Sequence, residues 1–264
     1  ADAASGPRPA GRAHGPEAGW TTLRGFEVIA ATSDNVYTVH MMTIALIPGA
    51  GGDAFYWHRV VPLLEVRGRR VVTIDLPAED ESAGVEEYAD AVLAAVDKSE
   101  HVVLVAQSLG GYTAAAVAER IPVELIIYVA AMIPGNDTAG DWWEATGQPM
   151  ARRACDIREG RDPDAPFDET VTFLHDIPAG VLSEVLAAGA SPQTGTPFGT
   201  PNTWSAWRSV PSRAIAATRD RMFPLEFMRA QVRDRLGIEA DEIDSGHLPG
   251  FSRAGELATL ITRY

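Results

Sequence analysis

The strongest chemical signal in the sequence is a serine within the string Ala106-Gln107-Ser108-Leu109-Gly110-Gly111. A β-branched run, residues 101–107, precedes this serine, and an alanine-rich segment, residues 112–120, follows it. The serine therefore stands where a strand should pass into a helix. A tight turn at such a point lifts a serine hydroxyl above the sheet when the residues two before and two after it are small, as both are here. The pattern predicts a nucleophile elbow with Ser108 as the nucleophile; the alternative is an ordinary β-to-α turn whose serine caps the helix.

A glycine-rich turn, Pro48-Gly49-Ala50-Gly51-Gly52, follows the first apolar run of the chain, residues 43–48. Acyl transfer at a nucleophile elbow needs two backbone N–H donors for the developing oxyanion. One comes from the residue after the nucleophile and one from the loop after the first strand. We therefore predict that the N–H groups of Leu109 and Ala50 form the oxyanion hole. A phosphate-binding loop is disfavoured, because no Gly-Lys-Ser/Thr follows and the G-x-G-x-x-G spacing is absent.

The acid and the base that would activate the serine are expected after later strands. His247 follows the last apolar run, far downstream of Ser108, in the chain order Ser–Asp/Glu–His. Asp220 directly follows the run 213–218, so its carboxylate would reach the same sheet edge. There it would orient the imidazole and stabilise its charged form. Asp137, after the fourth run, is the rival for this role, and the predicted triad is Ser108, Asp220 and His247.

The rest of the chain alternates apolar runs with segments of helix length, which is typical of an α/β protein. The expected strands are residues 43–48, 70–75, 101–107, 124–131, 213–218 and 238–243, and the expected helices are residues 55–67, 85–96, 112–120, 225–236 and 254–262. The alternation stops after Pro134, and so long a stretch should carry helices of its own; candidates are residues 167–173 and 181–188. We predict an α/β fold with about six mostly parallel strands, helices on both faces, and a helical cap, residues about 134–205, inserted after the fourth strand.

Composition disfavours several other classes of protein. Lys and Arg number 22 against 36 Asp and Glu, and the net charge of −14 disfavours binding to nucleic acids and to anionic membranes. The single cysteine, Cys155, rules out an intrachain disulfide and a cysteine-based zinc cluster. No apolar run reaches the ~18 residues of a membrane-spanning helix, and no secretory signal is visible. We therefore expect a soluble, cytoplasmic protein.

Residues 1–40 differ from the rest of the chain. Residues 1–19 are dominated by Ala, Gly and Pro without a helix or strand period, and Met41 and Met42 directly precede the first apolar run. We expect residues 1–40 to be a disordered or upstream-derived extension, and residues 41–264 to form the domain.

With the serine string, the glycine turn and the late histidine in place, residues 43–264 resemble the α/β-hydrolase superfamily. The turn 48–52 followed by Phe55-Tyr56-Trp57, and the Ser-Gly-His after the last strand, are similar to one branch of it. That branch contains small-molecule esterases, plant methyl esterases and hydroxynitrile lyases; Pro48 stands in the place of its usual histidine. The resemblance implies an α/β-hydrolase fold, an acyl-enzyme formed on Ser108, and no metal or organic cofactor.

We therefore expect a serine hydrolase that cleaves a small, largely apolar carboxylic ester. Hydroxynitrile lyases of the branch carry a lysine directly after the catalytic histidine, where this chain has Leu248, and its only lysine is Lys98. A lyase is the less favoured alternative, and a non-catalytic receptor on the same scaffold stays open. Aromatic residues of the cap should line an apolar pocket, and the predicted substrate-binding residues are Trp142, Trp143, Phe173 and Trp204. The oligomeric state stays open, with a homodimer among the alternatives.

Overall fold

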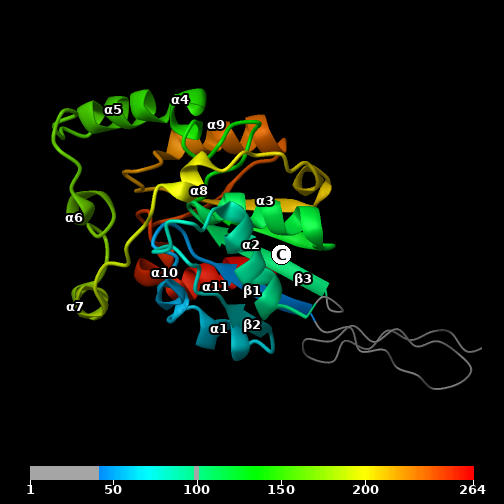
Figure 1. Ribbon diagram of the computed structural model, residues 1–264. Coiled ribbons are helices and arrows are strands. Elements are labelled where there is room, and N and C mark those ends of the chain that lie inside the picture. Colours follow the sequence, from blue (N-terminus) through cyan, green and yellow to red (C-terminus); the bar gives the residue numbers. More distant parts are fainter. Residues whose placement is uncertain (1–41, 98–100) are drawn as a thin grey trace, which may run out of the picture.

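The computed structural model describes residues 42–97 and 101–264 of the chain. Its centre is a six-stranded sheet with the order β2-β1-β3-β4-β5-β6, in which every neighbouring pair of strands is parallel (Figure 1). The strands are β1 (Met42–Ile47), β2 (Arg70–Thr73), β3 (His101–Gln107), β4 (Leu125–Val129), β5 (Ser212–Ala217) and β6 (Asp241–Ile243). The predicted six-stranded parallel fold is confirmed. The predicted extension, residues 1–40, lies outside the described residues, as do Met41 and Lys98.

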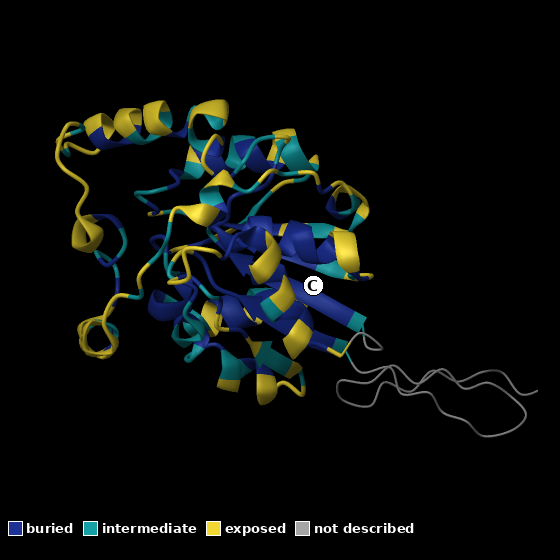
Figure 2. Cartoon of the chain, viewed as in Figure 1, coloured by how far each residue is buried: buried dark blue, intermediate teal, exposed yellow. Residues whose placement is uncertain are grey.

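Helices cover both faces of the sheet. Along β1, Ala45 and Ile47 belong to one hydrophobic cluster, whereas Ile44 and Leu46 belong to another. The first cluster joins α2 (Val85–Ala95), α3 (Gly110–Arg120) and α9 (Leu225–Leu236) to the sheet, and the second joins α1 (Val61–Glu65) and α11 (Ala254–Arg263). Because strands covered on two sides bury every residue, they appear in the sequence as continuous apolar runs. Figure 2 shows this buried centre.

One predicted helix has the wrong extent. Residues 55–67 form a 3-10 turn, η1 (Ala54–Trp57), and the separate short helix α1 rather than one amphipathic helix. Pro62 explains the break, because it has no N–H to donate to the preceding turn and is tolerated only in the first turn of a helix. The change of direction buries Tyr56 and Trp57 in the core.

The cap is the chain between β4 and β5, and it contains more helix than the sequence pattern predicts. Two of its helices were predicted, α6 (Glu169–Thr172) and α7 (Ala179–Ala188). Four further elements of the cap were not predicted: α4 (Trp142–Thr146), α5 (Gln148–Arg158), α8 (Thr196–Gly199) and η2 (Ala206–Ser209). Outside the cap, the short helix α10 (Pro249–Ser252) after β6 was not predicted either. The sequence pattern does not predict α5, because only Gln148, Cys155 and Asp156 of this helix are buried and its apolar residues show no helical period. In Figures 1 and 2 it lies across the top of the molecule with most of its surface exposed.

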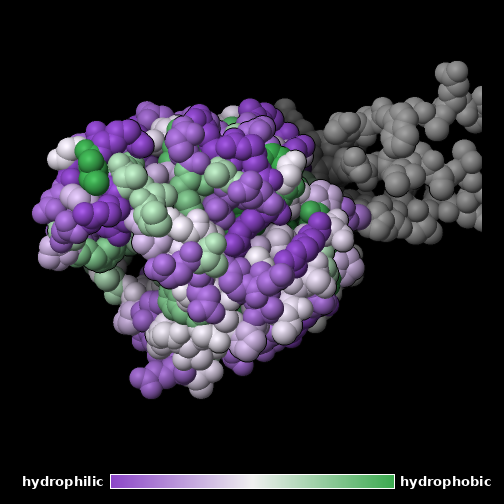
Figure 3. Space-filling model, turned by 90° about the horizontal axis from the view of Figure 1, so that it is seen from above, coloured by the Kyte–Doolittle hydropathy of each residue, from purple (hydrophilic) through white to green (hydrophobic). Residues whose placement is uncertain are grey.

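The face above α4, α5 and α9 is largely hydrophilic, with small hydrophobic areas (Figure 3). The large exposed apolar side chains of the cap are Met150, Ile157, Phe167, Val171 and Leu186. Within residues 42–97 and 101–264, no helix has both the length and the apolar character that crossing a membrane requires.

Candidate active site

The turn between β3 and α3 holds Ser108 in a strained backbone conformation. Its φ of 49° lies in the left-handed region, which costs a non-glycine residue about 1–3 kcal/mol and is typical of a nucleophile elbow. The end of the neighbouring strand holds the turn in place: the Ser108 N–H donates to the Val129 carbonyl at 3.4 Å, and the Ser108 carbonyl accepts from the Met132 N–H at 3.0 Å. The strain therefore persists because β4 and the segment directly after it bind the serine on both sides.

The two glycines after the serine are required by close packing. A Cβ at Gly110 would lie 2.7 Å from the Pro48 carbonyl oxygen, and one at Gly111 would lie 1.9 Å from the Met132 carbonyl oxygen. The first turn of α3 is thus pressed between the loops that follow β1 and β4, and only residues without a side chain fit there.

The three side chains of the predicted triad come from three separate loops and form one hydrogen-bonded chain. His247 Nε2 lies 3.0 Å from Ser108 Oγ, and His247 Nδ1 lies 2.8 Å from Asp220 Oδ2. The Asp220 side chain is fully buried, and its Oδ1 accepts from the N–H groups of Met222 at 2.8 Å and Phe223 at 2.9 Å. Because Nδ1 faces the carboxylate, Nε2 is left to accept the serine proton.

Aromatic rings and a glutamine fix the position of the imidazole. Phe173 stacks on His247 with ring centroids 5.1 Å apart, and Phe223 meets it edge-on at 5.0 Å. The Gln107 side chain donates to the His247 carbonyl at 3.2 Å. Gln107 belongs to the serine string, but the pattern of that string predicts no role for it.

The rival acid, Asp137, lies elsewhere. Its carboxylate pairs with the Arg235 guanidinium at 3.3 and 3.4 Å, and both side chains are largely buried. This pair anchors the beginning of the cap to α9. The structure therefore brings Asp220, and not Asp137, to the histidine.

The glycine turn after β1 passes directly beside Ser108. A Cβ at Gly49 would lie 2.8 Å from the Cβ of Ser108. Among the described residues, the N–H groups of Ala50 and Leu109 have no hydrogen-bond partner. Both amides are thus free to bind an anionic oxygen next to the serine.

A glutamine of the cap, which the sequence analysis missed, holds this turn from outside. Gln193 Oε1 accepts from the Gly51 N–H at 2.9 Å, and Gln193 Nε2 donates to the Tyr88 hydroxyl at 3.0 Å. Ser191 adds a second contact, since its hydroxyl donates to Asp53 at 2.9 Å. No local motif marks Gln193, which lies 142 positions from Gly51 in the chain.

We expect Gln193→Leu to lower kcat at least about tenfold with a smaller change in KM, because the peptide next to the Ala50 donor would lose its anchor. Gln193→Glu keeps an oxygen that accepts from Gly51 and should retain more activity. Steady-state kinetics on a p-nitrophenyl ester would measure both. Equal losses in the two variants would show that the contact with Gly51 is not what matters.

The pocket that contains the serine and the histidine has a volume of about 190 Å³. Its apolar lining comes from both the core and the cap and consists of Phe55, Tyr56, Phe173, Leu174, Val185, Leu248 and Phe251. Asp53, Glu169 and Ser191 add polar groups to the lining. A cavity of this size and lining suits a small, largely apolar substrate.

Two of the four predicted substrate-binding residues do not line this pocket. Trp142 is fully buried, packs against Phe223 and Phe227, and donates its indole N–H to the Ile133 carbonyl at 3.0 Å. Trp204 is also buried and donates to Glu86 at 2.7 Å. Contrary to expectation, both tryptophans pack the base of the cap, where an indole ring buries much apolar area and its N–H finds a partner.

The other two predicted residues lie at cavities. Phe173 lines the catalytic pocket, and Trp143 lines a larger cavity of about 870 Å³ beneath α5. Phe167 lines the larger cavity and contacts Phe173, with ring centroids 5.6 Å apart. The Phe173 ring therefore lies between the larger cavity and His247.

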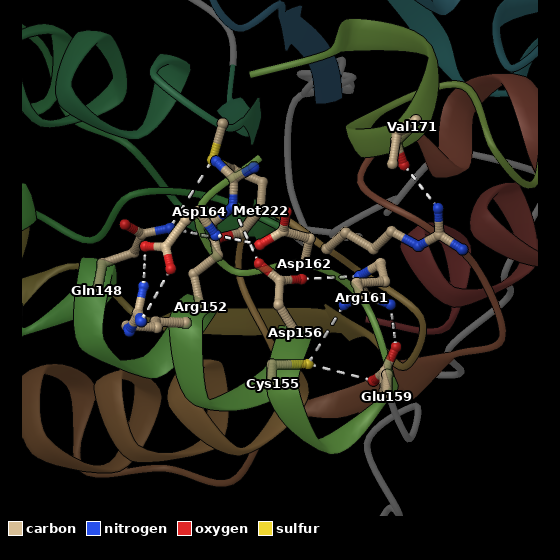
Figure 4. Close-up of polar contacts among 12 residues, drawn as sticks. Gln148, Arg152, Cys155, Asp156, Glu159, Arg161, Asp162, Asp164, Val171 and Met222 are labelled. Atoms are coloured by element: carbon tan, nitrogen blue, oxygen red, sulfur yellow. Dashed lines mark hydrogen bonds and ion pairs between the residues drawn. The ribbon is translucent and has the colours of Figure 1, made fainter. Parts of the chain in front are cut away.

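Several charged side chains at and beside the larger cavity pair with one another (Figure 4). Arg161 binds Asp156 at 2.7 Å and also binds Glu159, and Arg152 lies 3.8 Å from Asp156. Cys155 Sγ lies 3.1 Å from Glu159 Oε1. This network ties α5 to the loop after it. Nowhere in the described part of the chain do three His, Cys, Asp or Glu side chains come together as metal ligands would.

Comparison with known protein families identifies the family to which nearly the whole described domain belongs. The sequence profile of the alpha/beta hydrolase family matches residues 44–260. The chain belongs to the alpha/beta hydrolase family. The match runs from β1 to α11 and so includes the glycine turn, the serine, the aspartate and the histidine of this hydrolase.

Relatives of this hydrolase include Norfluorocurarine synthase 1 of Strychnos nux-vomica, 34% identical over 248 residues, which cover 80% of this chain and 91% of that protein. Methylesterase 3 of Arabidopsis thaliana is 24% identical over 247 residues, which cover 83% of this chain and 94% of that protein. Among solved structures, a pyrethroid hydrolase from Sphingobium faniae matches with a TM-score of 0.64 at 25% identity, covering 84% of this chain and 96% of the other. The predicted resemblance to the branch with the plant methyl esterases is confirmed.

Proposed function

We propose that this hydrolase is a serine esterase that cleaves a small, largely apolar carboxylic ester through an acyl-enzyme. Ser108 is the nucleophile, His247 the general base and then acid, and Asp220 the residue that orients the imidazole. The observation that carries the proposal is the hydrogen-bonded chain Asp220–His247–Ser108, with spacings of 2.8 and 3.0 Å. The kinship with a methylesterase supports ester hydrolysis as the activity.

The geometry supports the following sequence of steps. His247 Nε2 takes the proton of Ser108 as the serine oxygen attacks the ester carbonyl carbon. The free N–H groups of Ala50 and Leu109 stabilise the tetrahedral oxyanion. The intermediate collapses, the C–O bond to the alcohol breaks, and the imidazolium protonates the leaving alcohol. A water molecule then attacks the acyl carbon with His247 as its base, the bond between that carbon and Ser108 Oγ breaks, and the imidazolium returns the proton to the serine as the carboxylic acid leaves.

The pocket lining does not favour a hydroxynitrile lyase. Leu248, which directly follows the histidine, lines the catalytic pocket with an apolar side chain. The resemblance implies a lysine there in the lyases, whose ammonium stabilises cyanide. A leucine offers no charge for that purpose, so ester hydrolysis is the better match.

A burst experiment tests the esterase proposal against a non-catalytic receptor. An activated ester such as p-nitrophenyl acetate should release p-nitrophenol in a rapid phase whose amplitude equals the enzyme concentration, followed by steady turnover. Pretreatment with a fluorophosphonate should remove both phases. Saturable binding of esters without any release of p-nitrophenol would contradict the proposal and favour the receptor.

We expect Phe173→Ala to change which esters are preferred. Loss of the ring opens the small catalytic pocket toward the larger cavity, so kcat/KM for a bulky acyl ester should rise relative to a short one by about threefold or more. Trp142→Ala is the control, because it removes a buried ring outside the pocket and should lower stability by about 3–5 kcal/mol. It should affect both esters equally. An unchanged ester ratio in Phe173→Ala would contradict the assigned role.

A further inference from the structure

A second buried carboxylate lies beside the catalytic loop. Asp176 belongs to the cap, between α6 and α7, and its side chain is only 1% exposed. Its Oδ2 accepts a hydrogen bond from the N–H of Gly246 at 2.7 Å. Because Gly246 directly precedes His247, a residue of the cap is bonded to the backbone that carries the histidine.

The contact is too close to admit a side chain at position 246. A Cβ there would lie 2.6 Å from Asp176 Oδ1. The neighbouring backbone groups are held by core residues: the Gly246 carbonyl accepts from Ser245 Oγ at 2.8 Å, and the His247 carbonyl accepts from the Gln107 amide at 3.2 Å. Asp176 supplies the corresponding contact from the cap.

The charge of Asp176 is only loosely compensated. Arg219 Nη2 lies 3.8 Å from Asp176 Oδ2, but Arg219 Nε binds Asp244 more closely, at 2.8 Å. Asp176 Oδ1 is buried without a hydrogen-bond partner in the described part of the chain. Burying a carboxylate in this way is unfavourable. A neutral amide could accept the same hydrogen bond, so the negative charge requires a separate explanation.

The Asp176 carboxylate lies within electrostatic reach of one residue that lines the pocket, Tyr56. Burial raises the pKa of Tyr56, and the carboxylates of Asp220 and Asp176 add to that rise. The Tyr56 side chain lines the pocket, and its hydroxyl accepts from the Gly250 N–H at 3.0 Å. Asp176 therefore acts on Tyr56 with the same sign as Asp220, and Tyr56 lines the same pocket as His247.

We propose that Asp176 is a positioning residue that fixes His247 through the Gly246 amide, and that its negative charge stabilises the imidazolium formed when Ser108 is deprotonated. The inference rests on the proposed function, which makes His247 the general base. A carboxylate near an imidazole favours the charged ring.

Other ionisable groups also face the histidine or its loop. Asp220 binds Nδ1, Tyr56 and Glu169 line the pocket, and Arg219 and Asp244 lie at the ends of β5 and β6. All five remain when Asp176 is replaced. His175 also lies against the loop, since its Cε1 would be 2.9 Å from a Cβ at Gly246; burial lowers the pKa of this imidazole, and Asp176 raises it. The difference between the wild type and the variant therefore reports the charge of Asp176 together with its effect on His175.

The pH dependence of kcat/KM tests the charge. Asp176→Asn keeps an oxygen that accepts from Gly246 but removes the charge, so the acid limb of the profile should move to lower pH by about half a unit or more. Asp244→Asn is the matched control, since it removes an equal charge near Gly246 whose side chain is 68% exposed and screened by solvent. Its acid limb should move by less than about 0.2 units. An Asp176→Asn profile that coincides with those of the wild type and the control would overturn the proposal.

A second variant tests the positioning. Asp176→Ala removes both the acceptor and the charge and leaves the Gly246 N–H without its partner, so kcat should fall at least about tenfold while KM changes less than about threefold. Asp176→Asn should restore most of kcat but not the position of the acid limb. Equal kcat values for Asp176→Ala and the wild type would show that the contact positions nothing.

The proposal stays testable if the Asp176 variants fail to fold. Gly246→Ala leaves Asp176 in place but adds a Cβ that would push the carboxylate away from the loop. The pH dependence of the rate at which a fluorophosphonate labels Ser108 then gives the acid limb without any turnover. An unshifted labelling profile in Gly246→Ala would overturn the proposal. If the proposed esterase function itself is wrong, the result is different: the wild-type protein neither hydrolyses esters nor reacts with the fluorophosphonate.

Discussion

Ser108→Ala should abolish covalent labelling by a fluorophosphonate and lower kcat for an activated ester by about 10⁴-fold or more. The reason is that the serine oxygen forms the acyl bond, and without it His247, which Asp220 orients, has no hydroxyl to activate. Active-site labelling followed by mass spectrometry, together with steady-state kinetics, would measure both effects.

Ser191→Ala is the matched control for this change. Ser191 also lines the catalytic pocket, but its hydroxyl is bonded to Asp53 rather than to the histidine. This variant should still be labelled with one phosphonate per chain, at Ser108. Turnover near the wild-type rate in Ser108→Ala would refute the assignment of the nucleophile.

Asp220→Asn should lower kcat by more than about 10², and the corresponding change in a serine protease costs about 10⁴. The amide keeps the shape of the carboxylate but removes its charge. It also allows the imidazole to adopt the tautomer in which Nε2 carries the proton and cannot accept one from Ser108. Asp220 Oδ1 accepts from two backbone amides, so the turn that carries the side chain should keep its form. The kcat of the variant on an activated ester is the measurement.

Asp137→Asn is the control for this second prediction. It weakens the pair with Arg235 and should lower the free energy of unfolding by about 1–3 kcal/mol, with little loss of kcat at matched folded fraction. Thermal unfolding followed by circular dichroism separates the two effects. A large loss of kcat in Asp137→Asn together with a nearly normal kcat in Asp220→Asn would place the triad acid after β4 and contradict the assignment of Asp220.

Local sequence was sufficient to place the sheet and the three residues of the hydrogen-bonded chain. Buried parallel strands appear as short apolar runs, and the carboxyl ends of such strands meet at one edge of the sheet. Residues in the loops that follow β3, β5 and β6 therefore come together whatever the details of the cap. The helix α9 has the predicted bounds, since its residues pack on the sheet with a regular period.

Only the tertiary structure decided what the cap does. Trp142 and Trp143 are neighbours in the sequence, yet one is fully buried in the core and the other lines a cavity, because adjacent helical residues point about 100° apart. The contacts of Asp176 with Gly246 and of Gln193 with Gly51 span 70 and 142 positions. Nothing in the local sequence marks such partners, since each contact depends on how the cap packs over the ends of the strands. The sequence by itself thus determined the sheet and the order of the reactive groups along its edge, and the packing of the cap decided which further side chains hold those groups in place.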